Sequence, residues 1–124
     1  MRDAAIDHIL ACARRRSMTA YGDLWSAIEH RLARDLGSSR RQLPNLLGHI
    51  SEHFYDETGL MLTALVVHDA GDEHPGEGFF REVARLGALP EGDAPPAGRP
   101  WTGMTRVQTE FWKTQVRLLF DRGV

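Results

Sequence analysis

Six side chains of the types that bind metal ions are concentrated in one short, acidic stretch of the chain. These are His68, Asp69, Asp72, Glu73, His74 and Glu77. Imidazoles and carboxylates are ligands for zinc and calcium, but their spacing here matches neither the calcium loop of an EF-hand nor His-Glu-x-x-His. A solvated acidic turn accounts for the pattern better. No metal or other cofactor is therefore predicted, and metal binding by residues 68–77 stays an open alternative.

The residues that could support catalysis are isolated from the partners that catalysis needs. Cys12 is the only cysteine, which suits a small buried residue in a reducing compartment and excludes an internal disulfide. Gly76–Gly78 precedes an apolar pattern, but it lacks the lysine of a phosphate-binding loop, and Glu77 would repel a phosphate. His49 and His53 share one helix face without a third ligand. No catalytic residue is predicted, and the chain is not expected to be an enzyme.

The net charge of −2 is divided unevenly along the chain. Residues 1–50 carry eight arginines and five acids, residues 51–98 two arginines and ten acids, and residues 99–124 five bases and two acids. Their net charges are +3, −8 and +3. Such a division is typical of a basic binding face opposite an acidic side, although an unevenly charged solvated surface gives the same pattern.

The composition indicates one cytoplasmic globular domain. The chain has 124 residues, of which 42% are hydrophobic and 26% charged, as in ordinary soluble domains. No apolar run approaches the roughly 18–20 residues of a membrane span, so no membrane association is expected. The N-terminal residues also lack the apolar core of a signal peptide.

Apolar residues recur at helical spacing in most of the chain. This periodicity predicts helices over 3–16, 20–35, Pro44–Thr58, 78–87 and 104–121. Pro44 suits a first helical turn, and Gly59 a C-terminal stop. Gly48, within the third helix, is interpreted as a point of close approach by another backbone. Three helices followed by a strand is the order of a winged helix-turn-helix.

One segment breaks this helical pattern. Leu60–Val67 is an uninterrupted apolar run between turn residues, which predicts a buried strand, or wing, over Leu62–Val67. The expected fold is therefore mainly α with a small β element: a winged-helix-like three-helix core, a short strand and a C-terminal helix. Residues 1–87 form the core, 88–103 a Pro/Gly-rich surface linker, and 104–124 a helix packed on that core, giving a single domain.

The last helix carries more apolar surface than one buried face requires. A helix on a small domain buries an arc of about 100°, whereas apolar residues here form two stripes. Unless that surface is covered within the chain, the second stripe would be exposed and would favour a two-fold homodimer. The predicted interface residues are Trp112, Val116 and Phe120.

Three segments resemble the helix-turn-helix domain of the DNA alkyltransferases and alkyltransferase-like proteins. Tyr21–Leu24 looks like the start of that family's second helix, Leu46–Ile50 is similar to its recognition helix, and Leu62–Val67 lies where the family has Pro-Cys-His-Arg-Val-Val. A glycine-rich loop follows, as in the family: Gly71, Pro75, Gly76 and Gly78. The resemblance covers about residues 15–80 and implies a winged-helix fold and DNA contact.

The chain departs from this family at the residues that perform alkyl transfer. Thr63 stands at the acceptor cysteine, Ala64 at the histidine and Leu65 at the arginine of the motif, while Asn45 replaces the arginine that the family inserts into the duplex. The resemblance therefore implies the scaffold without its transfer chemistry.

Two functions of different classes follow from these patterns. The first is a non-enzymatic, regulatory module that binds duplex DNA through arginine–phosphate contacts and the third helix. Its predicted nucleic-acid-binding residues are Arg14, Arg15, Arg16, Arg40, Arg41, Asn45 and His49. The alternative is a small bacterial protein–protein interaction module, such as an adaptor, regulator or immunity protein. It would bind its partner through the acidic loop or the C-terminal helix.

Overall fold

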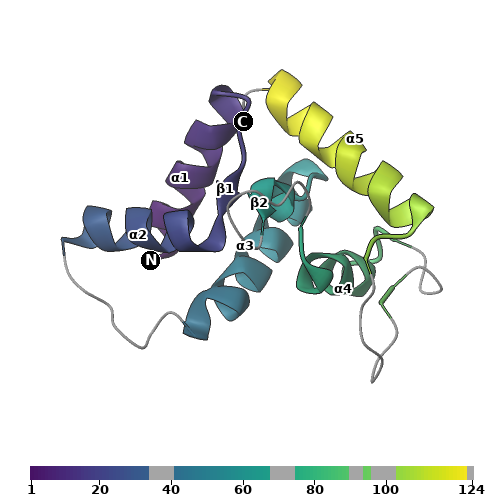
Figure 1. Cartoon of the computed structure of the whole chain (residues 1–124), viewed down its shortest axis with the longest axis horizontal. Coiled ribbons are helices and arrows are strands. Elements are labelled where there is room, and N and C mark those ends of the chain that lie inside the picture. The colour runs from purple at the N-terminus through teal and green to yellow at the C-terminus, as the bar shows by residue number, and fades with distance from the viewer. Residues whose placement is uncertain (34–40, 68–74, 90–93, 96–102, 123–124) are drawn as a thin grey trace.

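The fold is mainly α with a small β element, as predicted (Figure 1). A computed structural model describes residues 1–33, 41–67, 75–89, 94–95 and 103–122. Its elements in chain order are α1 (Arg2–Arg14), β1 (Thr19–Ala20), α2 (Tyr21–Leu32), α3 (Leu43–Thr58), the 3₁₀ helix η2 (Leu62–Leu65), β2 (Val66–Val67), α4 (Glu77–Arg85) and α5 (Arg106–Arg122).

The five α-helices of the described part lie where the apolar periodicity predicts them. Each buries one apolar stripe; for α1 the stripe includes Ile9 and Ala13. Backbone geometry fixes two of the helix ends. Gly59 ends α3 in a left-handed conformation with φ 73°, which glycine adopts without steric penalty. Ala33, at φ 54°, ends α2 after Leu32, before the predicted end at residue 35.

The prediction of one strand over Leu62–Val67 is wrong for its first four residues. Leu62–Leu65 forms the 3₁₀ helix η2, and only Val66–Val67 is a strand. β2 pairs in parallel with β1, Thr19 opposite Val66 and Ala20 opposite Val67. The predicted burial is confirmed for the whole run. An unbroken apolar run has no periodicity that separates a strand from a tight helical turn. Any continuation of a wing beyond Val67 falls in 68–74, outside the described residues.

The core is built around η2, which contacts α1, α3 and α5. Leu62 and Leu65 are fully buried there. Side chains distant in sequence satisfy polar groups of the same segment. The indole Nε1–H of Trp112 donates to the Ala64 carbonyl oxygen over 2.8 Å, and the Met61 N–H donates to Gln115 Oε1 over 2.8 Å. The last helix therefore completes the core rather than lying loosely on it.

The Pro/Gly-rich segment contributes to the core at the few positions that are described. Leu89 is part of the core and Pro95 is buried, so the prediction of a surface linker over 88–103 is wrong at these two positions. No helix in the described part is both long enough and apolar enough to cross a bilayer.

Candidate functional site

The first half of α3 presents a run of exposed polar side chains. Arg41, Asn45 and His49 recur at intervals of four residues and are exposed, as is Gln42. The opposite stripe of α3, including Leu47, is buried. No acidic residue lies in the first turn. Two of the seven residues predicted to contact DNA, Asn45 and His49, therefore share one face of α3. Arg41 lies in the turn just before the helix, and Arg40 lies outside the described residues.

The second half of α3 is acidic. Glu52 Oε2 accepts a hydrogen bond from Arg85 of α4 over 3.3 Å, and His53 Nε2 lies 3.4 Å from Glu57 Oε1. His53 thus faces a carboxylate of its own helix. In the ranges that the structure describes, no three His, Cys, Asp or Glu side chains come together as metal ligands would. Most of the acidic loop 68–77 falls outside those ranges.

Arg14, Arg15 and Arg16 lie at the end of α1, at the opposite end of the molecule from the start of α3 (Figure 1). All three are exposed, but two make contacts within the chain. Arg15 Nη2 donates to Cys12 Sγ over 3.5 Å. Arg16 pairs with Asp121 over 3.2 Å and lies 5.5 Å above the ring of Phe120. The predicted DNA-binding residues thus form two separate groups.

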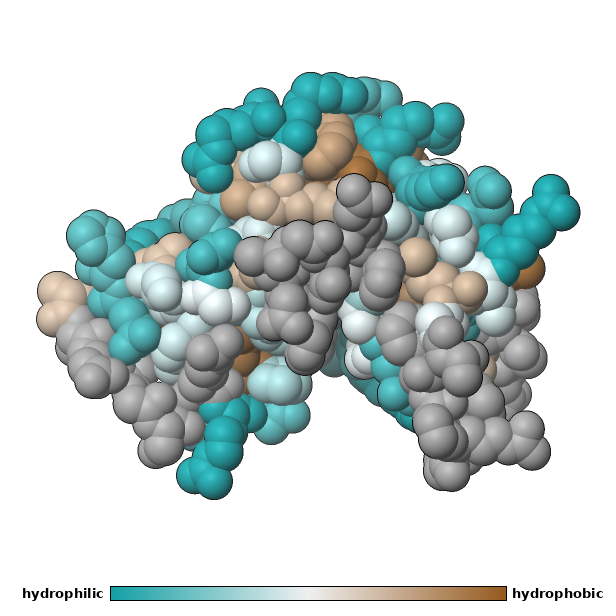
Figure 2. Space-filling view, viewed as in Figure 1, coloured by the Kyte–Doolittle hydropathy of each residue, from teal (hydrophilic) through white to brown (hydrophobic). Residues whose placement is uncertain are grey.

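The end of α1 meets α5, which brings together two segments that are positively charged in the sequence. Arg16 joins Lys113 and Arg117 around a groove of about 280 Å³. The apolar residues that line it are Met18, Trp112, Val116 and Phe120. Figure 2 shows hydrophilic side chains around a hydrophobic patch between these helices. The cations of α5 were missed by the sequence reasoning, although the two segments of charge +3 signalled them.

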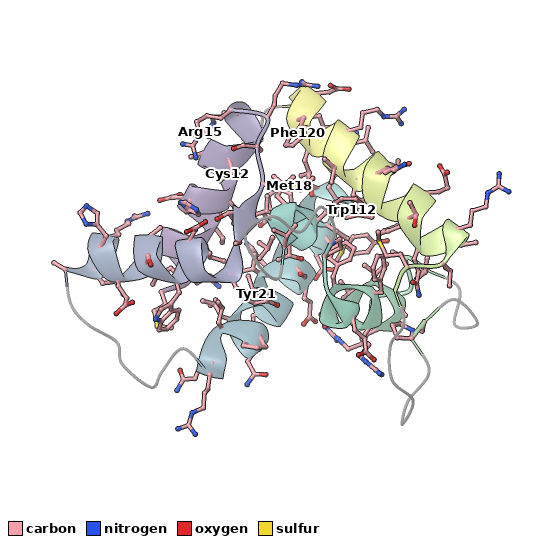
Figure 3. All side chains as sticks on the ribbon, in the orientation of Figure 1. Cys12, Arg15, Met18, Tyr21, Trp112 and Phe120 are labelled. Carbon is pink, nitrogen blue, oxygen red and sulfur yellow. The ribbon has the colours of Figure 1, made fainter. Side chains whose placement is uncertain are left out.

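The three predicted interface residues all line this groove, but they are less exposed than a dimer interface requires. Trp112 is 7% exposed and Val116 9%, and Phe120 is partly buried against the core. Figure 3 shows Phe120 near the C-terminal end of α5, beside the end of α1, and Trp112 on the inner side of α5. The condition that favoured a homodimer, a second apolar stripe left uncovered, is therefore not met at these positions.

A second, smaller pocket lies beside α3 and has a volume of about 90 Å³. Its polar lining includes the hydroxyls of Ser51 and Thr63, which are buried and 2.7 Å apart. Tyr21 also lines it, and burial raises the pKa of that phenol. Its walls include Leu47, Gly48, Gly76, Gly78 and Glu82. Residues of α2, α3, η2 and α4 thus converge on one pocket.

Gly48 opens this pocket rather than admitting another backbone, so its interpretation from the sequence is corrected. A Cβ built at Gly48 would meet the Glu82 carboxylate, with Oε2 3.7 Å away, and among the described residues outside α3 no backbone atom lies within 4 Å. Thr63 stands where the resemblance places the acceptor cysteine. Its hydroxyl is hydrogen-bonded to that of Ser51, and a hydroxyl is too weak a general base to activate it at neutral pH.

Cys12 lies in a polar cluster that the sequence reasoning did not find. Its Sγ is 3.8 Å from His8 Nε2, and the same nitrogen lies 3.0 Å from Thr19 Oγ1. Burial is the main cause that lowers the pKa of His8. The positive charge of Arg15 lowers it further, and the negative charge of Asp23 acts to raise it. The signal was the four-residue spacing of His8 and Cys12 on α1. Cys12 itself is only 2% exposed.

Comparisons with known proteins identify no relative of this chain: no protein-family model, curated protein or solved structure matches it.

Proposed function

We propose that this chain is a non-enzymatic DNA-binding module of winged-helix-like type, which presents the first half of α3 to a duplex. One observation carries the proposal. The exposed polar side chains of the turn before α3 and of its first half are a cation, two amides and an imidazole, with no acid among them. Arginine binds phosphate, and amides and imidazoles form hydrogen bonds with base edges. The resemblance of Leu46–Ile50 to a recognition helix supports the same surface.

The acids on α3 restrict how the helix can approach DNA. Glu52, Asp56 and Glu57 are exposed in its second half, where they would repel phosphates. Contact is therefore confined to the first turns, as when the N-terminal residues of a recognition helix read the major groove. The N-terminal end of α3 also carries the positive end of the helix dipole, which favours a neighbouring phosphate.

In this arrangement Arg41 holds a phosphate while Asn45 and His49 face the groove. Arg14, Arg15 and Arg16 lie at the other end of the molecule and take no part in that contact. A small pocket beside α3, lined by the hydroxyls of Ser51 and Thr63, opens next to the same helix. We assign these residues a regulatory role, in which the bound protein occupies a stretch of DNA without catalysing a reaction on it.

The test measures binding to a fluorescently labelled duplex by anisotropy at several salt concentrations. We expect affinity to fall with salt, because each neutralised phosphate releases condensed counterions. Arg41→Glu should weaken binding to all duplex sequences alike, by roughly tenfold. The matched control is Arg14→Glu, which makes the same charge change at the end of α1.

Two outcomes would contradict the proposal. If the wild-type chain binds no duplex at low salt, the function is wrong. If Arg14→Glu weakens binding and Arg41→Glu does not, the α3 surface is wrong. The alternative, a protein partner bound by the acidic loop, depends mainly on 68–74, outside the described residues, and stays a prediction.

A further inference from the structure

The groove between α1 and α5 combines an apolar floor with a cationic rim. Met18, Val116 and Phe120 provide apolar lining, with Trp112 at the base (Figure 3). The cations Arg16, Lys113 and Arg117 are exposed around it. Within the described part of the chain, only Arg16 of these three cations pairs with an acid, Asp121, at 3.2 Å. An occupant that buries apolar groups must therefore bring negative charge with them.

The length of the groove matches a short amphipathic segment. Trp112, Val116 and Phe120 are four residues apart, so they follow α5 for about 12 Å at 1.5 Å per residue. Peptide helices that bind in grooves place apolar anchors at one-turn intervals along just such a strip. The neighbouring Lys113 and Arg117 are also one turn apart, and so can face two successive acids of the bound segment.

Nucleic acid is a poorer match for this groove than an acidic peptide. Single strands are held by bases that stack on exposed aromatic faces. Trp112 is 7% exposed, and its indole N–H is already bonded to the Ala64 carbonyl. The guanidinium of Arg16 covers the ring of Phe120 at 5.5 Å. Cations are available here, but a flat stacking surface is not.

We propose that the α1–α5 groove binds an acidic amphipathic segment of a partner protein. The apolar residues of that segment contact Met18 and Phe120, the partly exposed apolar side chains of the groove, and its carboxylates pair with the rim cations. This site is distinct from the α3 surface, so the two interactions are independent. The chain would then connect DNA at one end with a protein at the other.

The test uses a fluorescein-labelled helical peptide with leucines at one-turn intervals and glutamates elsewhere, titrated with the intact chain. We expect binding that weakens with salt, and at least about tenfold weaker binding to Lys113→Glu/Arg117→Glu, because like charges across an interface repel strongly. The matched control, Arg41→Glu/Arg106→Glu, has the same net charge but leaves the groove unchanged. It should bind the peptide as the wild type does. Circular dichroism confirms that both variants remain folded.

Three results would overturn the proposal. One is equal loss of peptide binding in both double variants, which would reduce the effect to net charge. Another is equally tight binding of peptides in which lysine replaces glutamate or serine replaces leucine. The third is an oligothymidine that binds as tightly as the peptide and is lost with the same groove variant. Because the control variant reverses Arg41, its expected loss of duplex binding with retained peptide binding separates this inference from the proposed function.

Discussion

Trp112 and Gln115 show how single polar atoms of α5 stabilise the centre of the fold. One donates to the Ala64 carbonyl and the other accepts from the Met61 N–H, both over 2.8 Å. Leaving a buried backbone group without its partner costs about 1–3 kcal/mol. Trp112 therefore stabilises the fold through the hydrogen bond of its indole nitrogen as well as through the buried area of its ring. Hydropathy does not contain that hydrogen bond, so the burial of Trp112 could not be deduced from hydropathy alone.

At the same scale, His8 should make stability depend on pH. Its folded-state pKa is lowered from 6.5, chiefly by burial. The unfolded chain then binds protons more readily, so stability is fully present above about pH 7 and falls as the pH drops through 6.5 and below. We expect the urea midpoint of the wild type to decrease between pH 7.5 and 5.5, and that of His8→Gln to decrease less.

The control for this experiment is His30→Gln, which changes an exposed histidine of α2. It should keep the pH dependence of the wild type. Groups facing the His8 ring include Cys12 and Thr19, with Arg15 and Asp23 acting through their charge. If His8→Gln loses as much stability on acidification as the wild type, another group causes the effect.

At the scale of elements, the helices were predictable because each carries a local signal, and η2 was not. Apolar spacing, Pro44 and Gly59 define α3 from its own residues. Leu62–Leu65 contains only apolar residues and one threonine, and its 3₁₀ turn is fixed by α3 and α5, which are distant in sequence. The parallel pairing of β2 with β1 is likewise a long-range contact that no local pattern contains.

Gly48 provides a test at this scale. Replacing a mid-helix glycine by alanine stabilises a helix by about 0.5–1 kcal/mol when space permits. The new methyl group would lie 3.7 Å from Glu82 Oε2, an ordinary contact. We expect Gly48→Ala to raise the free energy of unfolding by that amount, measured in urea.

Gly59→Ala is the matched substitution on the same helix, and it should destabilise the protein because φ is 73° there. Had Gly48 been needed for a close backbone approach, both substitutions would be destabilising. That result would restore the interpretation drawn from the sequence.

For the whole molecule, the sequence revealed which segments are charged but not which of them meet. Arg14–Arg16 and the α5 cations are about a hundred residues apart, and only packing places Arg16 beside Lys113 and Arg117. The same packing separates Arg16 from Arg41, which the sequence had grouped. The α3 face was predictable because Asn45 and His49 are exposed by the same periodicity that buries Leu47.

Burial of Trp112 leads to a prediction about the mass of the molecule. With that side chain inside the core, no large apolar patch on α5 requires a second copy to cover it. We expect sedimentation equilibrium to give a monomer near 13.9 kDa. Trp112→Glu should lower stability rather than dissociate a dimer. A wild-type dimer that this substitution dissolves while the chain stays folded would show that the packing argument is wrong.

The hydrogen bonds from α5 to the backbone around η2 also have a consequence for the synthesis of the protein on the ribosome. Until the 17 residues of α5 emerge, the nascent chain has neither the indole for Ala64 nor the amide for Met61, and it leaves much of its most apolar segment uncovered. At roughly 5–20 residues per second, making that helix takes about 1–3 s. During this interval Leu60–Val67 stays exposed, and a chaperone that binds apolar segments would recognise it. We expect the chaperone to dissociate when α5 closes the core.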